Sequence, residues 1–336
     1  MKMSTKHKRL HKWLLAATIL VLLQLLLAHK VQAETRFVIS IIDTGIDLKN
    51  ETLKKQLCRN EGEMGRDKNG NPKSTNGMDD DGNGYIDDLH GWSFFDKSND
   101  LQDQHGHGTH VAGIIYQELK QLKLENEFCF QVLKYYNSET YSPHLLQASN
   151  QSLKYAALNK SQLINYSGGG YAANKEEEFW LRQLAHKNIP VMAAMGNQTL
   201  DTDQFPFYPA GYDLENVFAI AAATPEQTRA PFSNYGKRKF DFMAPGVHIK
   251  AFGLNNSQAY LSGTSQATAK ASAMVAYLVY QNQNTFDWKD LKTNLKNWRQ
   301  IYSRLNKKEN PEFLDSGFIQ KYKTTQVDAF GEPSPN

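Results

Sequence analysis

The chain of 336 residues, 40% hydrophobic and 22% charged, has the composition of a globular protein. Its formal net charge of +3 comes from its first 33 residues, which hold six Lys and Arg and no acid. The remaining residues include 32 basic and 35 acidic ones, which gives a net charge of −3. This charge balance argues against a nucleic-acid partner.

Residues 1–33 have the pattern of a cleaved signal peptide. Basic residues come first, an apolar run from Trp13 to Ala28 follows, and Val31 and Ala33 are small residues at the positions that signal peptidase recognises. The run is shorter than the ~20 residues of a membrane-spanning helix, so we expect cleavage rather than an uncleaved anchor. The mature protein is predicted to be exported, secreted or periplasmic, without stable membrane association.

Apolar runs alternate with helical stretches along residues 34–330, which no repeat or Pro/Ser-rich linker divides. The predicted strands are Phe37–Ile42, Phe128–Leu133, Leu163–Tyr166, Val191–Ala194 and Val217–Ala222. The predicted helices include Thr109–Leu122, His144–Leu158 and Glu176–His186. This alternation predicts one α/β domain, a doubly wound and mainly parallel central sheet with helices on both faces. Residues 331–336 are predicted to be a disordered tail.

Three reactive groups stand at the ends of such elements. Asp43 follows the first predicted strand, His107 stands in the glycine-rich segment before the first predicted helix, and Ser265 opens a long Ala-rich helical stretch. A serine hydroxyl is a weak nucleophile at neutral pH and needs a base such as histidine. The imidazole in turn needs a carboxylate that fixes its tautomer. The three residues are therefore the parts of an acyl-transfer site.

Each part also has an ordinary structural interpretation. Histidines beside glycines are often structural, which is what we expect of His105 and His110, and Ser265 follows a helix N-cap pattern. Asp43 followed by Thr-Gly could be half of an aspartic-protease site with Asp315 as its partner. That interpretation fails because it leaves the histidine and serine segments unexplained.

These segments resemble the subtilisin-like serine peptidases, or subtilases, from about Phe37 to about Thr324. The resemblance implies a doubly wound fold, a polypeptide substrate and serine endopeptidase activity, with Asp43, His107 and Ser265 as the triad. Asn197, which follows a buried strand and Gly196, matches the side-chain donor to the oxyanion. The backbone N–H of Ser265 would be the second donor.

Two further segments match the substrate-binding strand and pocket of the family. The strand would end in Ser167, Gly168 and Gly169, whose small size lets a peptide bind as an added strand. Small residues at Gly168, Gly169, Ala194 and Gly196 predict a primary specificity pocket that is open and apolar. The alternative is that these glycines serve only turns.

An acidic insertion at residues 76–88 follows the first positions of an EF-hand calcium loop. The expected ligands of a structural Ca²⁺ are Asp79, Asp81 and Asn83, the Tyr85 carbonyl, and Asp87 or Asp88. The sequence departs from the EF-hand pattern at His90, which stands where a bidentate Glu is expected. Related acidic loops occur in bacterial subtilases. The alternative is a solvated acidic turn.

The chain departs from the family pattern in two ways. No propeptide fits between the predicted cleavage after Ala33 and the first strand, and Ala269 and Lys270 replace the usual proline and histidine after the serine. A catalytically inactive peptide-binding protein is therefore the competing hypothesis, with an esterase or amidase as a third. Whether Cys58 and Cys129 form a disulfide stays open.

Overall fold

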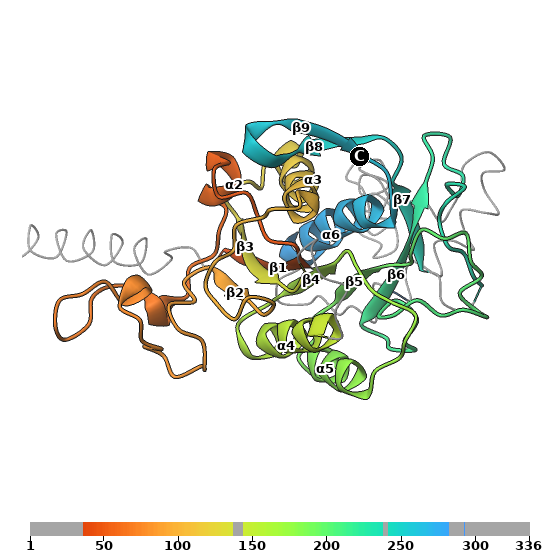
Figure 1. Cartoon of the computed structure of the whole chain (residues 1–336). Coiled ribbons are helices and arrows are strands. Elements are labelled where there is room, and N and C mark those ends of the chain that lie inside the picture. Colours follow the sequence, from red (N-terminus) through yellow and green to blue (C-terminus); the bar gives the residue numbers. More distant parts are fainter. Residues whose placement is uncertain (1–35, 137–143, 238–240, 282–291, 293–336) are drawn as a thin grey trace, which may run out of the picture. The chain divides into compact units, whose positions relative to one another are not determined.

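The computed structural model describes residues 36–136, 144–237, 241–281 and Lys292 (Figure 1). The predicted leader, the predicted C-terminal tail and, apart from Lys292, the other residues beyond position 281 lie outside these ranges. Within the described ranges no helix combines the length and apolar character that a membrane span requires.

A parallel sheet of seven strands runs through the described chain. The strands are β1 (Phe37–Asp43), β2 (Gly91–Ser93), β3 (Phe128–Lys134), β4 (Leu163–Tyr166), β5 (Val191–Ala194), β6 (Val217–Ala223) and β7 (Phe242–Pro245). Their order is β2-β3-β1-β4-β5-β6-β7, and every neighbouring pair is parallel. The predicted doubly wound sheet is confirmed, and β2 and β7 form its edges.

Helices cover both faces of this sheet (Figure 1). One face carries α3 (His107–Gln121) and α6 (Thr264–Gln281), and the other carries α4 (His144–Leu158) and α5 (Lys175–His186). Successive side chains of a strand point to opposite faces. In β6, Phe218 and Ile220 accordingly pack with α3 and α6, whereas Ala219 and Ala221 pack with α4 and α5. Burial on both faces explains why these strands are continuous apolar runs.

The remaining elements lie outside the sheet. They are α2 (Glu51–Lys55), the 3₁₀ turns η1 (Glu61–Glu63), η2 (Lys73–Thr75) and η3 (Leu254–Asn256), and an antiparallel hairpin of β8 (Ile249–Phe252) and β9 (Gln258–Leu261). Buried His110 ties α3 to this hairpin, because its Nε2 lies 3.1 Å from the Ile249 carbonyl and 3.2 Å from that of Ala259. The structural role expected for His110 is confirmed.

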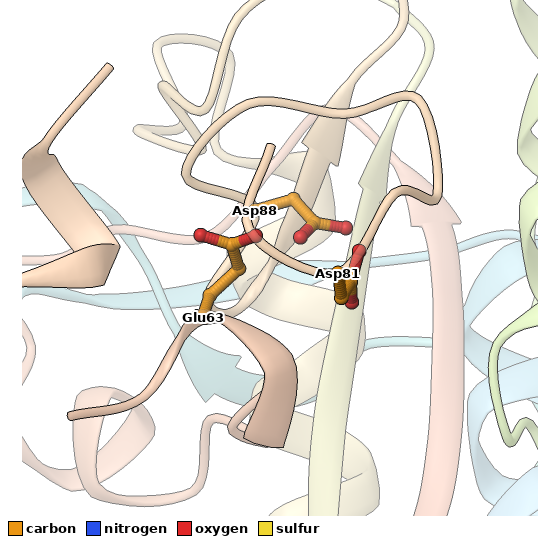
Figure 2. A group of neighbouring side chains, drawn as sticks. All are labelled: Glu63, Asp81 and Asp88. Carbon is orange, nitrogen blue, oxygen red and sulfur yellow. The ribbon is translucent and has the colours of Figure 1, made fainter. Parts of the chain in front are cut away.

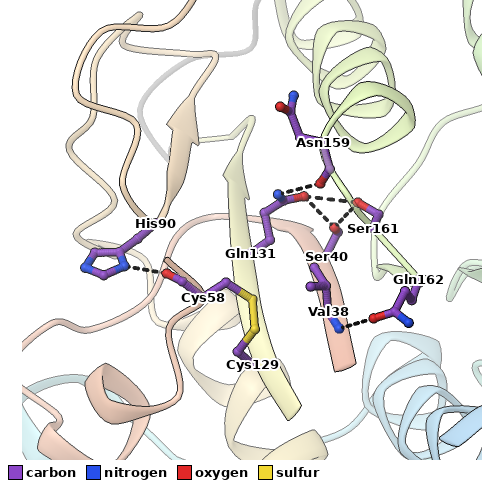
Figure 3. The surroundings of a disulfide bond; sticks show 9 residues. All are labelled: Val38, Ser40, Cys58, His90, Cys129, Gln131, Asn159, Ser161 and Gln162. Atoms are coloured by element: carbon purple, nitrogen blue, oxygen red, sulfur yellow. Dashed lines mark hydrogen bonds between the residues drawn. A yellow bond between two sulfur atoms is a disulfide. The ribbon is translucent and has the colours of Figure 1, made fainter. Parts of the chain in front are cut away.

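A disulfide joins Cys58, which follows α2, to Cys129 in β3, with their Cα atoms 4.8 Å apart (Figure 3). The backbone N–H of Cys58 also donates to the Phe130 carbonyl at 2.9 Å, so the two segments are already held in register. On the same strand Gln131 accepts from the Ser40 hydroxyl at 2.8 Å, which links β3 to β1. The structure thus decides the question that the sequence left open.

Removing the disulfide should destabilise the fold. The bridged cysteines are 71 residues apart, and loop entropy predicts a loss of about 4 kcal/mol in the free energy of unfolding for a loop of that length. The double variant Cys58→Ser/Cys129→Ser should therefore melt at a lower temperature than the wild type. Thiol titration of the denatured, unreduced wild-type chain should find no free thiol, and two free thiols would contradict the bridge.

Candidate active site

Asp43 and His107 meet at the carboxyl end of the sheet. Asp43 is the last residue of β1 and is buried, and His107 is the first residue of α3. His107 Nδ1 donates to Asp43 Oδ1 at 2.7 Å, and the backbone N–H of Thr44 donates to the same oxygen at 2.8 Å. Because Nδ1 carries the proton in this pair, Nε2 is left as the acceptor that a general base needs.

A second buried carboxylate, Asp103, fixes the turn that leads to His107. It accepts hydrogen bonds from the backbone N–H groups of His105, Gly106 and Thr109, each at 2.9 Å. The Thr109 N–H lies in the first turn of α3, which leaves it without an intrahelical partner, and the other two N–H groups belong to the turn that enters the helix. The sequence analysis missed Asp103, although an Asp just before a helix start is a signal for such a cap.

The two carboxylates act on the His107 imidazole in the same direction. Burial lowers the pKa of His107, but the charge and hydrogen bond of Asp43 and the charge of Asp103 outweigh it. The pKa therefore lies above the usual value of 6.5. His107 is thus set to accept a proton readily, since each additional pKa unit stabilises its charged form by about 1.4 kcal/mol.

Ser265 lies in the first turn of α6, which begins where β4 and β5 end. Its hydroxyl donates to the Ser167 carbonyl at 2.8 Å, and the Ser167 hydroxyl donates back to the Ser265 carbonyl at 3.1 Å. Within the described part of the chain, the Ser265 hydroxyl therefore points to Ser167 and makes no hydrogen bond with His107. Rotation about the Cα–Cβ bond of Ser265 would release it, and catalytic hydrogen bonds are often incomplete without substrate.

Asn197 is held beside Ser265 with a defined orientation. Its Oδ1 accepts from the backbone N–H of Thr264 at 2.8 Å and from the Thr264 hydroxyl at 3.0 Å. Two donors on Oδ1 leave the Nδ2 amide group as the end that can donate to a further acceptor. Thr264 was not singled out from the sequence, because a Thr before the serine indicates only a helix start.

These groups line one cavity of about 310 Å³. Its walls include every residue expected for catalysis, oxyanion binding and substrate binding: Asp43, His107, Ser167, Gly168, Gly169, Ala194, Gly196, Asn197 and Ser265. The structure therefore brings together side chains that are more than 200 positions apart in the sequence. His105 also lines the cavity, with its ring 6.2 Å from that of His107.

An aromatic residue, Phe207, lines the cavity beside the expected specificity pocket. The ring of Phe207 lies between Gly169 and Gly196, on the loop that follows β5. A Cβ placed on Gly169 would lie 2.8 Å from this ring, and one placed on Gly196 would lie 3.2 Å from it. The open and apolar pocket stays a prediction, which was made from the glycine segments without the loop that carries Phe207.

The replacement of the family's histidine by Lys270 has a structural reason. Lys270 forms an ion pair with Glu118 of α3, and both side chains are largely buried. The pair connects the two helices that carry His107 and Ser265. Ala269 is fully buried within α6, where alanine suits the helix interior. The backbone of α6 is therefore regular through both substitutions.

Outside the residues that line this cavity, two carboxylates of the acidic insertion lie beside a third carboxylate from η1 (Figure 2). Glu63, Asp81 and Asp88 offer oxygens that lie within 4.8 Å of one another. Glu63 is fully buried, and its Oε2 has no hydrogen-bond partner. Glu63 was not predicted from the sequence, because it stands outside the EF-hand-like motif and no spacing connects it to that motif.

The other expected metal ligands have different partners. Asp79 accepts backbone N–H groups of the loop itself, such as that of Gly84 at 2.7 Å, and Asp87 accepts from Gly77 at 3.1 Å. Asn83 donates through Nδ2 to Asp88 at 3.0 Å. The Tyr85 ring packs edge-on against Tyr155, Trp92 and Phe94.

Comparisons with known proteins match most of the chain. The model of the subtilase family matches residues 34–315. The thermophilic serine proteinase of Bacillus sp. (strain AK1) is 32% identical over 201 residues, which are 59% of this chain and 49% of that protein. Subtilisin Savinase of Lederbergia lenta is 32% identical over 215 residues, 62% of this chain and 75% of that protein.

Other matches differ in extent. Subtilisin-like protease 2 of Plasmodium falciparum is 32% identical over 192 residues, 54% of this chain but 14% of that protein. The chain thus spans half or less of several curated relatives that it matches. The crystal structure of a cold-adapted subtilisin-like serine proteinase has the same fold, with a TM-score of 0.60 and 22% identity over 79% of this chain and 84% of that one.

The raised pKa of His107 can be tested by NMR. In the Ser265→Ala variant, which removes the hydroxyl, the His107 ring should titrate above pH 6.5, the usual value. Adding Asp43→Asn removes the largest favourable interaction of the imidazolium, so the pKa should fall and protonation should require a lower pH. An unchanged titration midpoint in the double variant would contradict the pairing of Asp43 with His107.

Proposed function

Because this chain belongs to the subtilase family, we propose that it is a serine endopeptidase with Ser265 as its nucleophile. The observation that carries the proposal is the cavity in which the hydrogen-bonded Asp43–His107 pair faces Ser265 and Asn197. These are the groups that peptide-bond hydrolysis through an acyl-enzyme requires.

Each group has a defined part in the proposed reaction. Ser265 Oγ attacks the peptide carbonyl carbon while its proton moves to His107 Nε2, which then gives the proton to the departing amine. A water molecule next loses a proton to His107 and attacks the acyl-enzyme, and the product acid leaves with Ser265 restored. Asp43 keeps the imidazole in the correct tautomer and stabilises its charged form.

The negative charge of the tetrahedral intermediate falls on an oxygen between two donors. Asn197 Nδ2 supplies one hydrogen bond, because its Oδ1 is occupied by Thr264. The backbone N–H of Ser265 supplies the other at the positive end of α6. Losing such a side-chain donor lowers turnover by about 10²- to 10³-fold in subtilisin, the system in which it was measured.

The Ser265–Ser167 hydrogen bond favours one competing function. A subtilase scaffold whose serine stayed bonded to the Ser167 carbonyl would bind peptide without cleaving it. Both functions share the peptide-binding segment Ser167–Gly169. Only turnover or covalent chemistry at Ser265 distinguishes them.

We also propose that the protein is exported. The predicted leader supports this, and so does the Cys58–Cys129 disulfide, because such bridges persist in oxidising compartments. The substrate would then be an extracellular or periplasmic polypeptide.

The proposed structural ion is Ca²⁺, held by Glu63, Asp81 and Asp88. A buried carboxylate oxygen without a partner, as in Glu63, is costly unless a cation compensates it. Carboxylates are also the hard oxygen ligands that Ca²⁺ prefers. Calcium takes about six to eight oxygens, so backbone carbonyls and water would complete the shell. The ion would stabilise the long connection between β1 and α3 and would take no part in the chemistry.

Catalysis is tested by two substitutions. Ser265→Ala and His107→Ala should each lower kcat by a factor on the order of 10⁶, the loss measured for the corresponding groups of subtilisin, since triad members act as a unit. Both variants should remain folded and melt in one cooperative transition. Equal peptide hydrolysis by purified wild type and Ser265→Ala would contradict the proposal.

Calcium binding is tested by chelation and by a matched pair of variants. Calcium at a hundredfold excess over its dissociation constant should stabilise the fold by about 2.7 kcal/mol, which chelation removes. Glu63→Gln should abolish this response. The control Glu61→Gln alters an exposed carboxylate in the same turn, paired with Lys160 at 3.2 Å, and should respond like the wild type. If calorimetry detects no calcium binding at millimolar concentration, the proposed calcium site is contradicted and the acidic insertion is a solvated turn.

A further inference from the structure

Two segments determine where the side chain of a bound peptide can go. Ser167–Gly170 follows β4, and Ala194–Asn197 includes the end of β5 and the residues after it. The two strands are neighbours, with Tyr166 opposite Ala193. In the proposed function, the attacked carbonyl lies between Ser265 and Asn197. The side chain of the residue that carries this carbonyl, here called the acyl residue, then points between the two segments.

Phe207 occupies this space. Its Cε1 lies 2.8 Å from the position of a Cβ on Gly169, and its Cδ2 lies 3.2 Å from the position of a Cβ on Gly196. These two carbons are at opposite corners of the phenyl ring, so the ring spans the gap from one segment to the other. A Cβ on Gly169 would meet the Tyr208 carbonyl oxygen first, at 2.1 Å, and one on Gly196 would meet the Asn234 amide first, at 2.6 Å, so the ring is one of several groups that keep both walls free of side chains.

The ring is held from several sides. The following residue, Tyr208, pairs with Gly170 through two backbone hydrogen bonds of 2.7 and 2.9 Å. Tyr171 packs edge-on against Phe207, with ring centroids 5.1 Å apart.

Gln198 links this aromatic pair to the oxyanion segment. Its Oε1 accepts from the Tyr171 hydroxyl at 2.7 Å and from the backbone N–H of Asn197 at 2.9 Å. A ring tied in this way to both walls is a fixed part of the site. Displacing the ring would cost its packing against Tyr171.

We propose that Phe207 limits the acyl residue to glycine, alanine or serine, an inference that rests on the proposed endopeptidase function. An aromatic or long aliphatic side chain would require the space that the Phe207 ring fills. A methyl or hydroxymethyl group needs no such depth. A single methylene changes selectivity in an apolar pocket by about 10- to 200-fold, so exclusion of a whole phenyl ring should exceed 100-fold.

The kinetic test compares two chromogenic peptide anilides that differ only in the acyl residue, Ala or Phe. For the wild type, kcat/KM should be at least about 100-fold higher with Ala than with Phe. Phe207→Ala should raise kcat/KM for the Phe anilide by at least 10-fold and reduce the preference. Phe207→Leu should also reduce the preference for Ala over Phe, but by a smaller factor than Phe207→Ala. The control Phe205→Ala removes an aromatic ring that is 54% exposed in the same loop and should keep the wild-type preference.

Equal cleavage of the two anilides by the wild type would overturn the inference, and so would an unchanged preference in well-folded Phe207→Ala. A binding experiment distinguishes failure of this inference from failure of the proposed endopeptidase function. Uncleaved peptides with the same two acyl residues are titrated into Ser265→Ala by calorimetry. Tighter binding of the Ala peptide supports the inference even if the wild type hydrolyses neither anilide, and equal binding overturns it.

Discussion

The site depends on how the first turn of α6 is seated against the ends of β4 and β5. Thr264 bridges to β5, because its hydroxyl donates to Asn197 at 3.0 Å and accepts from the Gly196 N–H at 3.1 Å. Ser167 and Ser265 exchange two hydrogen bonds at the end of β4. The proposed nucleophile, oxyanion donor and substrate segment are thereby held by one set of contacts. Small shifts of α6 would move all three.

The residues of α6 after its first turn position the helix so that Thr264 and Ser265 meet the ends of β4 and β5. The helix is rich in buried alanines, and these small side chains let its axis lie close to the sheet. Deeper along the helix, Ser272 donates to Asn165 of β4 at 2.9 Å, a buried polar contact that sets the helix at one position along the strand. The ion pair of Lys270 with Glu118 joins α6 to α3. The serine and the histidine are therefore presented by two helices that are connected to each other.

Much of the fold could be predicted from the sequence, and so could the set of side chains that meet in the cavity. The strand Leu163–Tyr166 and the helix His144–Leu158 were predicted with their observed bounds, because both are strongly patterned and end at clear breaks. Asp43, His107, Asn197 and Ser265 could be found because each stands at the end of such an element. In a parallel sheet those ends meet along one edge.

The features that were missed come from contacts between loops. Phe207 is an aromatic residue in an irregular segment, and nothing in its neighbours indicates that its ring reaches Gly169 and Gly196. Glu63 lies in a short 3₁₀ turn and meets Asp81 and Asp88 only after the insertion has folded back. The disulfide likewise depends on a Cα separation that no sequence pattern fixes. Such contacts become visible only in three dimensions.

Covalent labelling of Ser265 tests the central claim most directly. A peptidyl phosphonate that reacts with activated serines should add one inhibitor mass per wild-type chain, and peptide mapping should place the adduct on Ser265. Neither Ser265→Ala nor His107→Ala should be labelled at the wild-type rate, because the first lacks the hydroxyl and the second lacks the base. A correctly folded wild-type chain that stays unlabelled, or that carries the adduct on another residue, would contradict the account.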